Sequence, residues 1–134
     1  MNEEQRALHQ LSHNWRRKSR ERLVAARRDL EEGMLEIAVS NMYYAMFYAF
    51  TAVLTIKGYK PLTKHSAVKA VFHRDFINQN LVEMKYGRLY QQLFDDRHRA
   101  DYDPVANFEQ EELEELLEQV TSFIAVCDQL TEKE

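Results

Sequence analysis

The segment FDDRHRADYDP, residues 94–104, holds the side chains best suited to chemistry. Arg97 and Asp101 are four residues apart, and on a helix they extend a core-facing stripe that begins with Tyr86, Tyr90 and Leu93. A partly buried guanidinium is costly unless a carboxylate or a phosphate satisfies its donors, and loss of the countercharge then costs a few kcal/mol. Two interpretations follow: a salt bridge that locks the helix end, or an Arg97 that binds phosphate while Asp101 orients it.

Three neighbouring or complementary side chains extend this candidate site. Arg99 can grip a second phosphate oxygen, whereas His98 is turned about 100 degrees from Arg97 on an ideal helix, which favours an exposed position. His65 is expected in the first turn of another helix, where the helix dipole disfavours its protonated form. His65 is therefore either a neutral imidazole available as a base or a packed residue with one hydrogen bond.

The segment SNMYYAMFYAF, residues 40–50, is unusually rich in aromatic residues. Such rings can stack on nucleic-acid bases, but they more often form a core or a dimer contact. Tyr43 and Tyr44 need polar partners if their hydroxyls are buried. Together with Ser40, which no nucleophile elbow surrounds, they are candidate ligand contacts.

Charge is distributed unevenly along the chain. Residues 16–28 hold seven basic residues and one acidic residue, whereas residues 109–134 hold nine acidic residues and one lysine. The basic segment can bind phosphates, or it can pack beside the acidic segment so that the two charges complement each other. The net charge of -4 gives no general support for nucleic-acid binding.

Several classes of protein are excluded or disfavoured. One cysteine, Cys127, permits neither an internal disulfide nor a cysteine zinc cluster, and no glycine-rich phosphate loop is present. Histidines and carboxylates lack a metal-binding spacing, so we expect neither metal nor cofactor. The longest apolar run is short and rich in tyrosine, so we expect a soluble cytoplasmic protein with no membrane span.

Three glycines and two prolines in 134 residues predict long helices with few breaks. We expect an all-α, up-and-down antiparallel bundle of four to five helices in one domain, residues 1–134. The predicted helices cover residues 4–32, 35–57, 64–78, 81–102 and 108–130. Gly33 and Gly58 end the first two.

The helix predicted over 35–57 is apolar on nearly every side, which places it at the centre of the bundle. A domain of this size would not cover it completely. We therefore expect a homodimer, with the end of the 81–102 helix near the interface.

The order and spacing of these segments resemble a prokaryotic HEPN domain of the small stand-alone kind. The resemblance covers residues 15–126, and its most telling parts are YYAMF (43–47), KHSAV (64–68) and RHRADY (97–102). It implies a helical bundle, frequent dimerisation, and metal-independent ribonuclease or toxin activity in many relatives. It also implies a minimal nucleotidyltransferase encoded nearby as antitoxin.

One departure from the family pattern bears on activity. Ribonuclease relatives carry a histidine four to six residues after the arginine, whereas no histidine follows His98 in this chain. Tyr102 occupies a matching position, but a phenol of pKa near 10 is a poor base.

Two functions therefore stay open. The first is binding of RNA or a nucleotide, with ribonuclease activity through Arg97 and a proton contact from Tyr102 or His65, as the toxin half of a two-gene toxin–antitoxin or defence system. The second is a non-catalytic interaction protein that docks a nucleotidyltransferase.

Overall fold

The computed structural model describes residues 1–132, which form the predicted all-helical antiparallel bundle. Its α-helices are α1 (Glu3–Glu31), α2 (Leu35–Ile56), α3 (His65–Val71), α4 (Met84–Tyr102) and α5 (Gln110–Glu132), and a π-helical segment, η1 (Phe72–Ile77), continues α3. The last two residues of the acidic segment, Lys133 and Glu134, lie outside the described residues.

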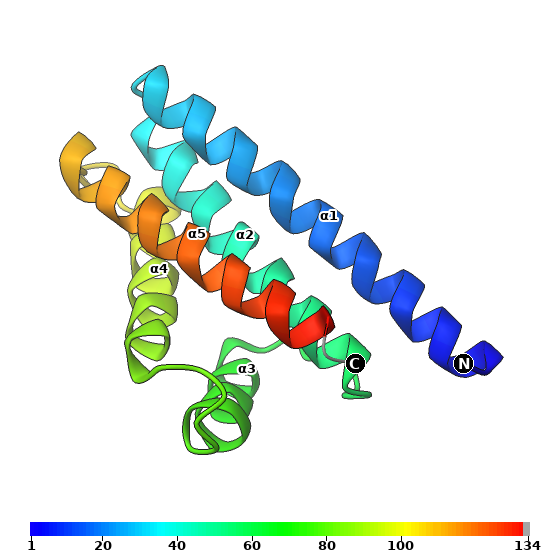
Figure 1. Ribbon diagram of the computed structural model, residues 1–134. Helices are drawn as coiled ribbons and strands as arrows, with labels where there is room; N and C mark the ends of the chain where they lie inside the picture. Colours follow the sequence, from blue (N-terminus) through cyan, green and yellow to red (C-terminus); the bar gives the residue numbers. More distant parts are fainter. Residues whose placement is uncertain (133–134) are drawn as a thin grey trace.

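Helix α2 is the central element, as its all-round apolar character predicts. It packs against α1, α4 and α5, and Figure 1 shows α1 and α5 running beside it. By length and composition alone α2 could cross a membrane, but 61% of its most apolar window is buried inside the bundle. That is the environment of a core helix.

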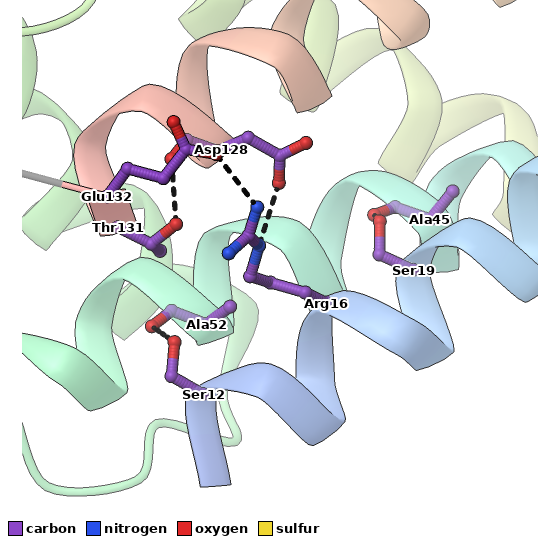
Figure 2. A network of polar contacts seen from close by, with 8 residues as sticks. All are labelled: Ser12, Arg16, Ser19, Ala45, Ala52, Asp128, Thr131 and Glu132. Carbon is purple, nitrogen blue, oxygen red and sulfur yellow. Dashed lines mark hydrogen bonds and ion pairs between the residues drawn. The ribbon is translucent and has the colours of Figure 1, made fainter. Parts of the chain in front are cut away.

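Small residues set the register between α1 and α2. The buried Ser12 hydroxyl donates to the carbonyl of Ala52 at 2.8 Å, and the buried Ser19 hydroxyl donates to Ala45 at 2.6 Å (Figure 2). Ser12 and Ser19 are two helical turns apart, as are their acceptors, so the two helices run antiparallel in one fixed register. The short side chains let the backbones approach closely enough for these bonds.

Glycines end the first two helices where the sequence predicted. Gly33 and Gly58 have φ values of 73° and 86°, the left-handed region that side chains with a Cβ rarely enter. The structure thus confirms both helix ends to within a residue or two.

The segment predicted as one helix over 64–78 differs from the prediction. It changes from α-helix to the π-helical η1 at Phe72, and α4 begins at Met84 rather than at residue 81. The carbonyl of Phe76 accepts from both Leu81 N and Val82 N, and Asn80 has φ of 58°. Residues 81–83 therefore belong to a closed turn, whereas helical periodicity alone assigns them to α4.

Gly87 lets α4 lie close to η1. A Cβ at this position would come within 2.8 Å of Ile77 Cδ1 and 3.0 Å of His73 Cε1. The missing side chain therefore brings the start of α4 against the π-helical turn.

The basic segment of α1 is divided by the fold. Arg16 donates to Asp128 at 3.0 Å and to Glu132 at 3.3 Å on α5, and its side chain is 20% exposed (Figure 2). Arg17 pairs instead with Glu21 on its own helix. The complementary-charge interpretation therefore holds for Arg16 but does not extend to the whole segment.

We expect Arg16→Ala to lower the free energy of unfolding by about 1–2 kcal/mol, because it removes two charge-assisted hydrogen bonds from a half-buried position. Arg17→Ala is the matched control, since it breaks only an exposed pair and should cost about 0.5 kcal/mol or less. Urea denaturation measures both. Equal losses would show that Arg16 does not tie α1 to α5.

Candidate functional site

Arg97 lies in an aromatic cage near the end of α4. Its guanidinium carbon is 5.0 Å from the ring centre of Tyr43 and 5.5 Å from that of Tyr44. Nη1 donates to the Tyr44 hydroxyl at 3.1 Å and to Asp101 Oδ2 at 3.4 Å. Nε is buried and has no hydrogen-bond partner. The cage holds the cation in place but leaves part of its donor set unused.

Along the stripe of α4 that carries Arg97, the side chains become more exposed toward the end of the helix. The Leu93 side chain is fully buried, that of Arg97 is 20% exposed, and that of Asp101 is 37% exposed. The expectation that losing Asp101 costs a few kcal/mol is therefore too large, because solvent screens this pair and an exposed ion pair contributes about 0–1 kcal/mol.

A cavity of about 200 Å³ opens beside Arg97. Helices α2 and α4, the start of α3 and the loop before it line it with Tyr43, Tyr44, Phe47, Thr63, His65, Val68, Tyr90, Phe94 and Arg97. Sites that enclose a drug-sized ligand usually have about 300–1,000 Å³. This cavity therefore suits a group the size of a phosphate or a sugar better than a whole nucleotide.

His65 shares this cavity with Arg97, and its hydrogen bonds define its protonation. Gln91 Nε2 donates to Asp95 Oδ1 at 3.0 Å, so its amide oxygen is the atom that lies 3.4 Å from His65 Nε2. His65 Nε2 must then carry the proton. The lone pair is on Nδ1, which is buried without a partner. The imidazole is thus arranged as a neutral base.

Ring stacking fixes the orientation of His65. Its ring centre is 3.5 Å from that of Phe94, with 14° between the planes, and 5.0 Å from that of Tyr90. Burial is the main cause that lowers the pKa of His65; Lys69 lowers it further, while Gln91 and Asp95 oppose the shift. At neutral pH the ring is therefore uncharged.

The shifted pKa of His65 predicts a pH-dependent stability. The unfolded chain binds a proton at about pH 6.5 and the folded chain only at lower pH, so the unfolded state holds more protons between the two values. Stability should therefore fall as pH falls below about 6.5. Between about pH 7 and pH 5, the melting temperature of His65→Phe should fall less than that of the parent. Equal falls in the two melting temperatures would contradict the lowered pKa of His65.

Tyr43 and Tyr90 line the cavity with buried rings. Their hydroxyl oxygens are 3.4 Å apart. Burial raises the pKa of Tyr90 far above its usual range, and the hydrogen bond with Tyr43 adds to this. Tyr90 therefore stays protonated, so it can act as a hydrogen-bond donor but not as a base.

Five predicted site residues are not among those that line the cavity, and one of them, Asp101, reaches the site only through its contact with Arg97. Tyr102 is 72% exposed, and its ring centre is 5.0 Å from that of His98, which is exposed too. Arg99 pairs with Asp96 at 3.3 Å and lies over the ring of Phe108. Ser40 is half-buried. At about 100 degrees per residue, positions 98, 99 and 102 lie on other faces of α4 than Arg97, so their roles stay predictions.

Some contributors were missed by the sequence analysis. Phe94 stacks on His65, and its spacing of three residues before Arg97 could have indicated a shared face. Arg22 of α1 lies 5.0 Å from the ring centre of Tyr44. Nothing in the local sequence indicates that contact, because it depends on how α1 packs against α2. Among residues 1–132 no group of three metal-binding side chains occurs.

Comparison with known proteins identifies the family. The HEPN domain matches residues 12–130, nearly the whole chain. The chain belongs to the HEPN family. It is 35% identical over 118 residues to a UPF0332 protein of Thermotoga maritima, covering 88% of this chain and 89% of that protein.

This HEPN chain is also similar in sequence, over shorter segments, to proteins of Methanocaldococcus jannaschii and Pyrococcus horikoshii. It is 37% identical to the "Putative toxin MJ0142" of Methanocaldococcus jannaschii over 61% of this chain and 55% of that one. It is 40% identical to UPF0332 protein PH1297 of Pyrococcus horikoshii over 51% of this chain and 47% of that one. The family resemblance drawn from YYAMF, KHSAV and RHRADY is confirmed.

Proposed function

We propose that this HEPN protein is toxin-like and binds RNA or a nucleotide through a phosphate held by Arg97. The observation that carries the proposal is the cavity that Arg97 and His65 line together, and each of these side chains also has one buried nitrogen without a hydrogen-bond partner. Two relatives from Methanocaldococcus jannaschii bear the names "Putative toxin MJ0142" and "Putative toxin MJ0605", which supports the toxin-like part.

The side chains divide the task by their chemistry. Arg97 neutralises the phosphate, the Tyr44 hydroxyl and Asp101 hold its guanidinium, and aromatic side chains form much of the surrounding wall. An anion would bind favourably here, because among residues 1–132 only one carboxylate, that of Asp101 at 3.4 Å, pairs with the positive charge of Arg97.

His65 adds the means for metal-independent RNA cleavage. As a neutral base it would take the proton of a ribose 2′-hydroxyl, whose oxygen then bonds to phosphorus while the bond to the 5′-oxygen breaks. The departing 5′-oxygen takes up a proton, for which the exposed Tyr102 is the predicted contact. His65 thereby replaces the histidine that ribonuclease relatives carry after the arginine.

The test uses labelled RNA and the pure protein in EDTA. We expect the parent to bind single-stranded or structured RNA and to cleave it without metal, and Arg97→Ala to bind at least about tenfold more weakly. Binding that survives in Arg97→Ala would overturn the proposal. Cleavage lost in His65→Phe with binding retained would support His65 as the base.

A specific surface favours a second candidate function, association with another protein. Tyr102, the last residue of α4, is 72% exposed, Val105 in the loop after it is 84% exposed, and Ile37 on α2 is 48% exposed. We propose that a second copy covers this end in a homodimer, while a minimal nucleotidyltransferase is the alternative occupant. Light scattering of the parent and Val105→Asp tests it; a monomer at every concentration would rule out the homodimer. We also propose a cytoplasmic location, where RNA and such a partner protein would both be present.

A further inference from the structure

A continuous row of rings and cations leads away from the Arg97 cage. We call it the aromatic–cation strip, and it consists of Trp15, Lys18 and Arg22 on α1, Tyr44 and Tyr48 on α2, and Arg97 on α4. Three helices contribute to it, and their sequence order gives no sign of it.

Rings and cations alternate along the strip at nearly constant spacing. The ring centres of Trp15 and Tyr48 are 5.4 Å apart, and those of Tyr48 and Tyr44 are 5.7 Å apart. Lys18 Nζ is 5.6 Å from both Trp15 and Tyr48, and Arg22 is 5.8 Å from Tyr48 and 5.0 Å from Tyr44. Arg97 then joins Tyr44 at the cavity.

The positive charge of this strip is poorly compensated. Within residues 1–132, Lys18 has no carboxylate partner, and Arg22 donates to the neutral amide of Asn41 at 3.1 Å. By contrast, Arg16 and Arg17 are each paired with acidic residues. The strip therefore offers three cations to an anionic chain. Within residues 1–132 only Arg97 pairs directly with a carboxylate, that of Asp101, whereas Asp29 accepts from Asn41 and not from Arg22.

We propose that single-stranded RNA runs along the aromatic–cation strip and delivers one phosphate to Arg97, an inference that rests on the proposed function. Backbone phosphates contact Lys18 and Arg22, and unpaired bases stack on Trp15 and Tyr48. A duplex is excluded from this mode because its base faces are already stacked, whereas the faces of an unpaired strand are free.

Trp15 allows a direct test because it is the one tryptophan of the chain. We expect a short single-stranded RNA to quench its fluorescence in proportion to binding, which the anisotropy of a labelled RNA reports separately. The same sequence as a duplex should leave the emission unchanged. Bound single strand without quenching would overturn the strip and leave the Arg97 proposal intact, whereas absence of any RNA or nucleotide binding would overturn both.

A pair of charge reversals on one helix provides the matched control. Lys18→Glu should weaken binding of single-stranded RNA and reduce the dependence of log K on log salt by about one unit. Arg20→Glu makes a similar charge change, but Arg20 is exposed and turned about 200 degrees from Lys18 on α1. We expect it to retain nearly the parent's slope. Equal effects would show that RNA contacts the outer face of α1 and would overturn the proposal.

A second copy of the chain is the competing occupant of the strip. Dilution of the protein alone would then change the Trp15 emission, and RNA would not. That outcome would overturn the RNA proposal. A dimer that forms with unchanged Trp15 emission, and still shows quenching by RNA, would support it.

Discussion

Arg97→Lys should weaken the binding of RNA or nucleotide by about tenfold while it leaves the melting temperature within about 2 °C of the parent. Lysine keeps the positive charge, and an ammonium can still lie over Tyr43 and Tyr44. It lacks the planar fork that can hold the Tyr44 hydroxyl, Asp101 and a phosphate oxygen together. Parent-like binding by this variant would show that Arg97 is not the phosphate ligand.

Asp101→Asn is the companion variant, and the structure predicts a small effect on stability. The carboxylate is 37% exposed and 3.4 Å from the guanidinium, so its removal should lower the melting temperature by no more than a few degrees. Binding of an anion should stay within about twofold of the parent, because the amide oxygen of asparagine can still accept from Arg97 Nη1 and hold the guanidinium. A large drop in stability would show that the pair is more buried than this geometry indicates.

Phe72→Ala should cost about 3–5 kcal/mol of unfolding free energy, the largest loss that we expect from one substitution. The Phe72 side chain is 1% exposed, and its ring centre lies 4.7 Å from that of Phe50 and 5.6 Å from that of Phe123. Its removal leaves a void where η1 meets α2 and α5. The surrounding rings cannot close this void without leaving their own contacts.

Urea denaturation at neutral pH measures this loss. Val105→Ala, at a position that is 84% exposed, is the control and should change stability by about 0.5 kcal/mol or less. Because Phe72 also stacks on Tyr90 in the cavity wall, the variant should bind RNA more weakly even where it is folded. A cost below about 1 kcal/mol would mean that the core repacks around the missing ring.

The sequence by itself determined the four long helices and their buried faces, because these depend on interactions a few residues apart. It did not determine the π-helical η1 or the turn before α4. Gly33 and Gly58 can adopt the left-handed conformation, so they predicted two helix ends. The stripe of Leu113, Leu116 and Val120 on α5 is buried as its helical spacing requires. The motifs YYAMF, KHSAV and RHRADY indicate the HEPN family from the sequence alone, and their spacing makes Arg97 the central residue of the candidate site.

Only the tertiary structure decided which side chains share that site. The exposure of His98 followed from helical rotation alone, but local spacing could not decide between Tyr102 and His65 as the proton contact. In the folded chain Tyr102 is 72% exposed, whereas the contact between α3 and α4 stacks His65 on Phe94. From the sequence, the basic residues of segment 16–28 could not be told apart in their roles. Packing divides it, since successive residues of a helix point in different directions: Arg16 faces acidic residues of α5, and Arg22 faces the ring of Tyr44.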